Sequence, residues 1–264
     1  MLYKDLFDCN EHYEKIDLNN ASFDKDGICI VMTTWKRRQY LQNTIIMLEK
    51  QKNKQKINFF IWNNNNNEES SFFSTIKSNI ININIHHSPI NIGGIGRFIL
   101  TKYICEKLHH FPSVIFIDDD QLFDNNTIEI LLTNFNENES YHWSGKIFNK
   151  SSYWKGISNV YHPCGEHYKY LDYGGTGFMI INTECFLIED FYKFNKKYLF
   201  IEDLWMSYFV INKLGYKLQN GKDLKNKVKI IEGENNNNIA QVNLLKSLKD
   251  EFLELLRTEG EWDV

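Results

Sequence analysis

Val114-Ile115-Phe116-Ile117-Asp118-Asp119-Asp120 joins a run of apolar residues directly to three consecutive acids. A short apolar run of this kind is typical of a strand buried in a parallel sheet. The acids then mark the carboxyl end of that strand, the edge at which α/β sheets bind their ligands. Because side chains alternate along a strand, we expect Asp118 and Asp120 to converge while Asp119 points elsewhere.

Strand-like and helix-like segments alternate on both sides of this stretch. The expected strands are residues 27–33, 57–62, 80–85, 113–117, 141–149 and 176–182, and the expected helices are residues 38–51, 70–79, 94–110, 183–191, 202–214 and 244–256. Such alternation predicts parallel βαβ units. The sequence therefore predicts an α/β fold of the Rossmann-like type, with a mostly parallel central sheet flanked by helices.

The composition argues against several classes of protein. The 264 residues carry a net charge of −4 and a pI near 6.1, which does not favour broad binding of nucleic acid. We find no apolar run of the roughly 18–20 residues that a transmembrane helix needs, and the acidic N-terminus does not resemble a signal peptide. The five scattered cysteines form no CxxC pair, so we expect reduced thiols and a cytoplasmic protein. The asparagine tracts at 63–67 and 235–238 point to an AT-rich genome, cellular or viral.

The three consecutive acids call for a positive charge close by. Without one, their mutual repulsion would raise their carboxyl pKa values and destabilise the fold. Hard carboxylate oxygens suit Mg²⁺ or Mn²⁺, which usually take one or two protein acids together with waters and phosphate oxygens. The alternative is a solvated acidic turn before a helix that starts near Asn125.

Three further segments carry groups suited to ligands. Residues 33–38 end the first strand with hydroxyl and basic groups that suit an anionic nucleotide. Residues 91–98 combine glycines with Arg97, without the GxGxxG spacing of a dinucleotide site. Residues 172–178 form a glycine turn suited to an acceptor pocket or a lid. Each segment also has a purely structural interpretation, as a helix start, a tight turn and a hairpin turn.

Glu202 and Asp203 open an expected helix after an apolar segment. Acids in a first helical turn are expected from capping and from the helix dipole alone. A carboxylate that follows the acid triad in the same chain also supplies a group able to accept a proton from a hydroxyl. Both interpretations stay open at the level of these residues.

Six motifs of the chain, taken in order, resemble one class of enzyme. TTWKRR (33–38), IWNN (61–64), NIGGIGRF (91–98), FIDDDQ (116–121), YGGTGF (173–178) and FIEDLWMSYF (200–209) look like those of GT-A-fold, nucleotide-sugar-dependent glycosyltransferases. The chain is similar to family 2 transferases in TTWKRRQYL, NIGGIGR and the ED pair, and to the exostosin C-terminal domain in IWNN, RF, DDD, TGF and ED. The resemblance covers about residues 28–220.

This resemblance implies a single GT-A-like domain over residues 1–264. An N-terminal extension at 1–27 would precede a nucleotide-sugar-binding half at 28–135. The acceptor-side half would follow at 136–264 and end in a closing helix.

The resemblance also implies which residues bind the donor. Thr33 and Arg37 would lie beside the nucleotide base or its phosphates, and Asn63 would stand where family 2 members often place an aspartate that reads the base. Asn91 and Arg97 would hold the diphosphate or the donor sugar.

The acids would complete the donor site and the catalytic site. Asp118 would contact the ribose or a metal-bound water, with Asp119 beside it, and Asp120 would ligate Mn²⁺ or Mg²⁺. The last histidine, His167, precedes the ED pair, so the metal would rely on Asp120, phosphates and water. Asp203 would remove the acceptor proton if the reaction inverts, and Glu202 would touch the acceptor or the donor sugar.

The expected function is therefore that of a metal-dependent glycosyltransferase of the hexosyltransferase type. It would move a sugar from a UDP-sugar to a hydroxyl of a glycan or glycoprotein, with inversion and with Asp203 as the base. One alternative is a degenerate, non-catalytic transferase that binds glycans or partners, and another is a retaining, exostosin-like enzyme. A phosphohydrolase with a strand-end aspartate as nucleophile is disfavoured, because Gln121 and Leu122 follow the triad where such enzymes show DxDx[TV].

Overall fold

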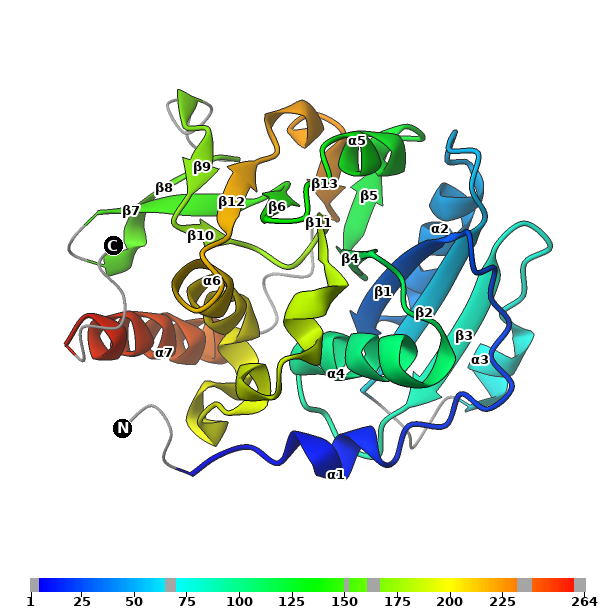
Figure 1. The fold of residues 1–264 in the computed structure, drawn as a ribbon, viewed down its shortest axis with the longest axis horizontal. Helices are drawn as coiled ribbons and strands as arrows, with labels where there is room; N and C mark the ends of the chain where they lie inside the picture. Colours follow the sequence, from blue (N-terminus) through cyan, green and yellow to red (C-terminus); the bar gives the residue numbers. More distant parts are fainter. Residues whose placement is uncertain (1–4, 65–69, 150–151, 161–166, 232–238, 259–264) are drawn as a thin grey trace.

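An eight-stranded sheet runs through the described part of the protein in a computed structural model, which describes residues 5–64, 70–149, 152–160, 167–231 and 239–258. Figure 1 shows this sheet crossing the molecule. Its strands, in spatial order, are β3 (Asn82–His87), β2 (Ile57–Asn63), β1 (Ile28–Thr34), β4 (Ser113–Asp118), β11 (Met179–Asn182), β6 (Glu139–His142), β12 (Lys217–Asn220) and β9 (Tyr170–Leu171).

Parallel pairing dominates the sheet, as the sequence predicts. Strands β3, β2, β1 and β4 are parallel to their neighbours, and so are β6 and β12. Strand β11 runs antiparallel to both β4 and β6, and β9 runs antiparallel to β12. From β1 the chain proceeds outward to β2 and β3, then returns to place β4 on the other side of β1. That reversal creates a crevice at the carboxyl ends of β1 and β4.

Helices cover both faces of the sheet. On one face Cys29 and Val31 of β1 pack with α4 (Ile95–Tyr103), α6 (Glu202–Asn212) and α7 (Ile239–Thr258). On the other face Ile30 and Met32 pack with α2 (Arg38–Glu49), α3 (Ser70–Thr75) and α5 (Thr127–Thr133). Because β1 and β2 are buried along their whole length, both are apolar without alternation.

Two smaller sheets flank the large one. One contains β10 (Tyr173–Gly174), β7 (Gly145–Asn149) and β8 (Ser152–Ser158), and the other pairs β13 (Val228–Ile230) with β5 (Gln121–Phe123). Strand β5 begins directly after Asp120. The acid triad is therefore anchored by a strand on each side.

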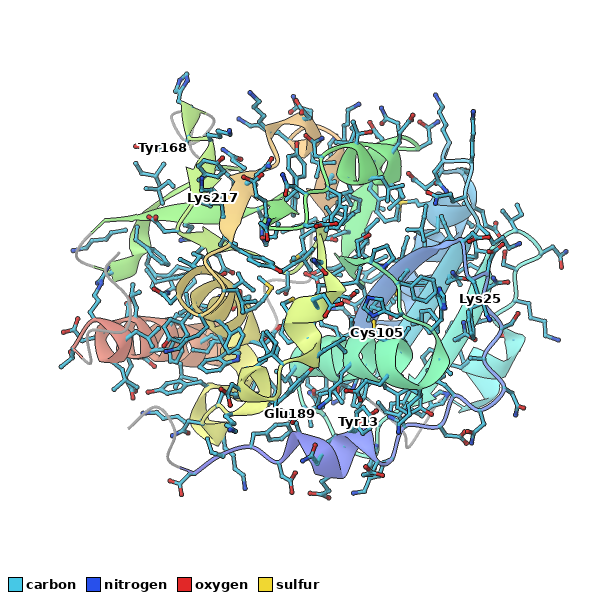
Figure 2. The ribbon with its side chains drawn as sticks, viewed as in Figure 1. Tyr13, Lys25, Cys105, Tyr168, Glu189 and Lys217 are labelled. Carbon is cyan, nitrogen blue, oxygen red and sulfur yellow. The ribbon has the colours of Figure 1, made fainter. Side chains whose placement is uncertain are left out.

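The N-terminal segment packs against α4. Its helix α1 (Cys9–Tyr13) is held by Tyr13, whose hydroxyl donates a hydrogen bond of 2.6 Å to Glu106. Lys102 of α4 donates to Glu189 at 2.5 Å, and Figure 2 labels Tyr13 and Glu189 along this lower edge of the molecule. Residues 5–27 thus contribute buried side chains to the core, Cys9 among them.

Several sequence predictions need correction. The helix expected at 70–79 ends at Thr75, the helix expected at 94–110 is α4 followed by a π-helical turn at Ile104–Leu108, and the strand expected at 176–182 begins at Met179. Residues 141–149 form two strands in different sheets, β6 and β7, because the chain turns out of the large sheet at buried Trp143. The strand expected at 80–85 is β3 at 82–87. The helix expected at 183–191 is a pair of 3₁₀ turns, Thr183–Leu187 and Glu189–Tyr192, the first capped by the Asn182 side chain.

The apolar face expected on the closing helix agrees with the structure where it is described. Leu248, Phe252 and Leu255 of α7 pack on the core as their spacing predicts, while the side chain of Leu244 lies outside the description. Cys9, Cys29, Cys105 and Cys185 are free thiols, and Cys164 also lies outside the described residues, as do most of both asparagine tracts. In the described part of the chain, no helix is both long and apolar enough to cross a membrane.

Candidate functional site

A cavity of about 620 Å³ opens at the carboxyl ends of β1 and β4. Thr33 of β1 pairs in register with Asp118 of β4, so the ends of the two strands lie side by side. The last residues of these strands and those that follow them, residues 33–37 and 118–120, line one side of the cavity. The turn before α4 lines a second side with Asn91, Gly93 and Gly94. This is the crevice that the strand order predicts.

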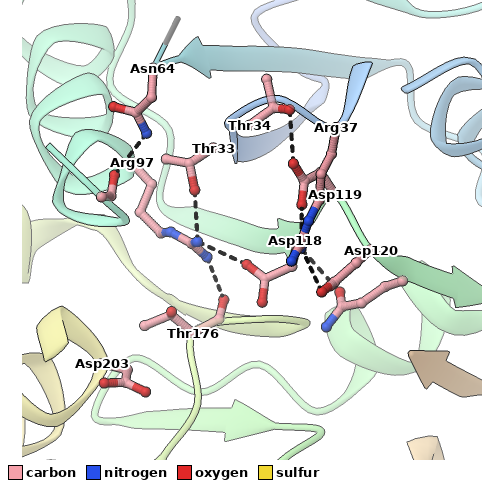
Figure 3. A network of polar contacts seen from close by, with 12 residues as sticks. Thr33, Thr34, Arg37, Asn64, Arg97, Asp118, Asp119, Asp120, Thr176 and Asp203 are labelled. Carbon is pink, nitrogen blue, oxygen red and sulfur yellow. Dashed lines mark hydrogen bonds and ion pairs between the residues drawn. The ribbon is translucent and has the colours of Figure 1, made fainter. Parts of the chain in front are cut away.

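Arg97 of α4 connects the strand ends below the cavity. Its Nη2 donates to Thr33 Oγ1 and to Asp118 Oδ1, each at 2.8 Å, and its Nη1 donates to the carbonyl of Thr176 at 3.0 Å (Figure 3). Burial lowers the pKa of Arg97, but the charges of Asp118 and Glu202 outweigh that effect and raise it overall. Arg97 therefore stays charged and neutralises the first acid of the triad.

Arg37 neutralises the other two acids. Its Nη1 contacts Asp119 Oδ1 at 3.2 Å and Asp120 Oδ2 at 2.7 Å, and the Thr34 hydroxyl donates to Asp119 Oδ2 at 2.8 Å. Burial raises the pKa of Asp119 to about 6, although Arg37 and Thr34 oppose the rise. Burial and then the charge of Asp118 also raise the pKa of Asp120. The expected convergence of Asp118 and Asp120, with Asp119 pointing elsewhere, needs correction. Strand β4 ends at Asp118, and beyond it Asp119 and Asp120 share Arg37 while Asp118 pairs with Arg97.

The sequence does not reveal that two arginines pair with the triad. Among the described residues, no three His, Cys, Asp or Glu side chains come together as metal ligands. Asp118 and Asp120 nevertheless line the cavity with side chains that are 35% and 20% exposed. Two hard carboxylates suit Mg²⁺ or Mn²⁺ when a ligand supplies phosphate oxygens as well. The donor set thus fits a cation shared with a bound diphosphate, rather than one held by protein alone.

Gly177 allows the turn before β11 to approach the acids closely. A Cβ atom at this position would overlap with the Asp118 carboxylate and would lie 2.7 Å from Gln121 Nε2. Gln121 in turn accepts a hydrogen bond from the Asp118 backbone N–H at 3.0 Å. The glycine turn is therefore part of the wall that fixes Asp118.

Asn64, next to the predicted Asn63, lines the cavity. Asn64 Nδ2 donates to the carbonyl of Gly93 at 3.0 Å, and its Oδ1 accepts from the Ile92 N–H at 3.1 Å. Asn63 is buried beside His87, with 3.0 Å between Asn63 Nδ2 and His87 Nδ1, and is not among the described residues that line the cavity. Asn64 thus ties β2 to the turn that contains Asn91.

Asp203 and Glu202, at the start of α6, have different surroundings. Asp203 Oδ2 accepts from Lys249 Nζ at 2.8 Å and from the Tyr173 hydroxyl. Burial would raise the pKa of Asp203, but the Lys249 charge and these hydrogen bonds lower it overall. Burial and the charge of Asp203 raise the pKa of Glu202 to about 7, against the opposing effect of Arg97. Figure 3 shows Asp203 apart from the arginine contacts, beyond Thr176.

The C-terminal half closes the cavity with apolar side chains that the site prediction omits. Leu245 and Leu248 of α7 and the half-exposed Phe200 line it. These residues carry no chemical signal of their own in the sequence. Their part in the site follows from where α7 packs, more than 120 positions after the triad.

The predicted site residues thus fall into three groups. Thr33, Arg37, Asn91, Arg97 and the three acids line one cavity. Glu202 lies behind that wall, with its carboxylate against Gly94, and Asn63 and Asp203 are not among the described lining residues.

The strand order and the position of this cavity define a GT-A-like α/β fold. A structure of S. aureus TarS 1–349 in complex with UDP-GlcNAc is similar to it, with a TM-score of 0.52 and 14% identity over 79% of this chain and 59% of that one. The complex of the same protein with UDP gives a TM-score of 0.50 and 15% identity over 75% and 58%. This chain thus spans less than two thirds of the TarS chains. No protein-family model matches the chain, and no curated protein matches it in sequence.

Proposed function

We propose that this protein is a glycosyltransferase that moves a sugar from a UDP-sugar to a hydroxyl group of a glycan or glycoprotein. One observation carries the proposal. The carboxyl ends of β1 and β4 meet at a cavity in which three acids and two arginines face one another. Its similarity in fold to TarS, solved with UDP and with UDP-GlcNAc, supports a nucleotide sugar as the ligand.

The chemistry of the cavity suits a diphosphate. Lys36 and Arg37 follow β1 and line it, and the hydroxyls of Thr33 and Thr34 lie at the end of the same strand. A guanidinium that faces both acids and ligand binds phosphate with directional hydrogen bonds. We assign Asn91, which lines the cavity from the opposite turn, to the diphosphate or the donor sugar.

We assign the divalent cation to Asp120 and Asp118. When bound there, Mn²⁺ or Mg²⁺ would neutralise the charge that grows on the departing diphosphate. Arg97 and Arg37 hold the two carboxylates in place before the ligand arrives. Such preorganised charge is the largest contribution to many enzymatic rates.

Asp203 is the general base of the proposed reaction. The acceptor oxygen forms a bond to the anomeric carbon, the bond from that carbon to the diphosphate oxygen breaks, and UDP leaves with the bonding electrons. The hydroxyl proton passes to Asp203. Asp203 is ionised because the charge of Lys249 lowers its pKa and outweighs the rise that burial would cause. Attack from the face opposite the diphosphate inverts the anomeric configuration.

A nucleotide-binding experiment tests the donor. Isothermal titration with UDP, GDP and CDP, each with and without Mn²⁺, should show a preference for UDP that depends on the metal. A ligand at about 100 times its Kd adds about 2.7 kcal/mol to stability, so thermal shifts provide a second measurement. Absence of binding by all three nucleotides would refute the proposal.

A second experiment tests the stereochemistry. Proton NMR of the first sugar released from an α-linked UDP-sugar should show the β anomer. Release of the α anomer would favour a retaining, exostosin-like mechanism, with binding unaffected.

A non-catalytic glycan-binding protein is the second candidate. It is favoured by the pairing of all three acids with arginines and of Asp203 with Lys249, which satisfies these groups without substrate. The half-exposed Trp154, beside the Lys146 ammonium at 5.0 Å from its ring, offers a surface for sugar stacking. Binding on a glycan array without any response to UDP would select this candidate.

A further inference from the structure

Lys249 belongs to α7, yet its ammonium group reaches the start of α6. Its Nζ lies 2.8 Å from Asp203 Oδ2, and the two side chains are only 12% and 19% exposed. The Tyr153 hydroxyl accepts a hydrogen bond from the same Nζ at 3.2 Å. The ammonium also stands 4.6 Å from the ring centre of Tyr153 and 5.2 Å from that of Tyr173.

Asp203 receives donors from three directions at this point. Lys249 and the Tyr173 hydroxyl share Oδ2, and the Leu204 backbone N–H donates to Oδ1 at 2.8 Å. The carboxylate is therefore fixed in direction as well as in charge. These donors together satisfy the lone pairs of a carboxylate that is largely buried.

The same helix lines the cavity. Leu245 and Leu248, one turn and one residue before Lys249, line the cavity together with the acid triad. The backbone N–H of Tyr153 donates to Asp250 Oδ1 at 2.8 Å, which fixes the register of α7 against β8. Docking of α7 thus places the apolar wall and the ammonium group together.

We infer that Lys249 is a positioning residue of the transfer reaction, which holds the Asp203 carboxylate ionised and oriented toward the acceptor hydroxyl. The inference rests on the proposed function. It makes α7 part of the catalytic apparatus, whereas the family resemblance ends near residue 220. Lys249 acts through Asp203 and does not itself contact the sugar.

Other charges near Asp203 have to be separated from that of Lys249. The groups that interact directly with the pair are Glu202, Tyr173, Tyr153 and Lys146, and behind them Arg97 acts on Glu202 and Asp250 on Lys146. Glu202 opposes ionisation of Asp203, and Lys249 is the cation in direct contact with it. Removal of Lys249 should therefore raise the pKa of Asp203, by about 1–3 units for a close ion pair.

Release of UDP from UDP-sugars by water, across pH 3 to 9, tests the inference, because the lowered pKa of Asp203 places the wild-type acidic limb below pH 3.8. In K249M the acidic limb of the plot of kcat against pH should move to higher pH by at least about one unit. At pH values on that limb, kcat should be about tenfold lower than in wild type. The KM for UDP-GlcNAc and the affinity for UDP should stay unchanged, because Lys249 does not contact the donor. K249R should restore part of the limb, since it keeps the charge.

The matched control is K197M. Lys197 also forms an ion pair with α7, through Glu251, but both side chains are about half exposed, and neither is among the described hydrogen-bond partners of Asp203. K197M should keep the wild-type pH profile. An equal shift in K197M and K249M would mean that the effect comes from docking of α7, and it would overturn the inference.

A double variant covers the case in which K249M does not fold. D203N/K249M carries no buried charge in the pair and should be as slow as D203N alone, because Lys249 acts through Asp203. A rate for the double variant clearly below that of D203N would assign Lys249 an independent role and overturn the inference. If wild-type protein binds UDP and hydrolyses the donor, and K249M has the same pH profile as wild type, the role of Lys249 is overturned but the proposed function is not. Wild-type protein that neither binds nor hydrolyses any nucleotide sugar would overturn both.

Discussion

Arg97 and Asp118 form an ion pair of 2.8 Å across the carboxyl end of the sheet, with Thr33 as the second acceptor of the same guanidinium nitrogen. The arginine is almost completely buried, whereas the Asp118 side chain is 35% exposed toward the cavity. The pair thus presents a carboxylate to a ligand and keeps its counter-charge behind it. An acid cluster held in this way remains folded before any cation arrives.

Replacement of Arg97 should destabilise the fold strongly. R97M leaves Asp118 without its partner and removes the hydrogen bonds to Thr33 and Thr176, so we expect a loss of about 3–5 kcal/mol in the free energy of unfolding. Urea denaturation monitored by circular dichroism measures it. The control is K193M, which removes an exposed pair with Asp190 and should cost less than about 1 kcal/mol. Similar losses in the two variants would contradict the buried network.

Asp120 should control the metal dependence of nucleotide binding. In D120N, the increase in UDP affinity caused by Mn²⁺ should fall at least about tenfold, because a neutral amide oxygen is a weaker ligand for a hard cation. Titration calorimetry with and without Mn²⁺ measures this effect. D124N is the control, since Asp124 lies four residues further along, outside the lining of the cavity. A full response to Mn²⁺ in D120N would remove Asp120 from the metal site.

An added methyl group at Gly177 should disturb the acid wall. The Cβ of G177A would overlap with Asp118 and approach Gln121 Nε2 at 2.7 Å. Because overpacking typically costs about 1–3 kcal/mol, the melting temperature should fall. The affinity for UDP in the presence of Mn²⁺ should fall as well, since Asp118 has to move. Unchanged melting and binding would show that this turn adapts freely.

Glu202 should make the protein less stable at neutral pH than at about pH 4.5. Its pKa is about 7 in the folded protein against an ordinary 4.5, because of its burial and then the charge of Asp203. As the pH rises from about 4.5 to 7, the unfolded chain releases this proton first, so stability falls. The glutamine in E202Q does not titrate. The free energy of unfolding of E202Q minus that of wild type should therefore be higher at pH 8 than at pH 4.5, by on the order of 1–3 kcal/mol. Urea titrations of both proteins at the two pH values measure the difference, and a constant difference would contradict the raised pKa.

Local patterns in the sequence were sufficient for the central sheet. The apolar runs that become β1, β2 and β4 are short, rich in β-branched or aromatic residues and followed by polar groups. Strands buried in a parallel sheet show this pattern. The prediction was less accurate at residues 141–149, since a change of sheet at Trp143 leaves the apolar pattern unbroken. It also failed at 183–191, where capping by Asn182 favours short 3₁₀ turns over a continuous helix.

Candidate residues were identified from the sequence more easily than their partners. Asp118, Asp119 and Asp120 are conspicuous because three consecutive acids after an apolar strand are costly without compensation. Arg37 and Arg97 were singled out as ligands for a nucleotide, and the structure adds their contacts with these acids. Neither contact has a signature in the chain, because the partners are separated by 21 to 83 positions.

The sequence by itself determined the α/β class, the strand that carries the acids and the edge of the sheet at which they lie, because hydrophobic periodicity and strand geometry are local properties. The tertiary structure alone decided which charges compensate the acids, that Asn64 faces the cavity beside the buried Asn63, and that α7 brings Lys249 to Asp203. Those outcomes depend on how distant elements pack, and packing is set by the whole core rather than by any one segment.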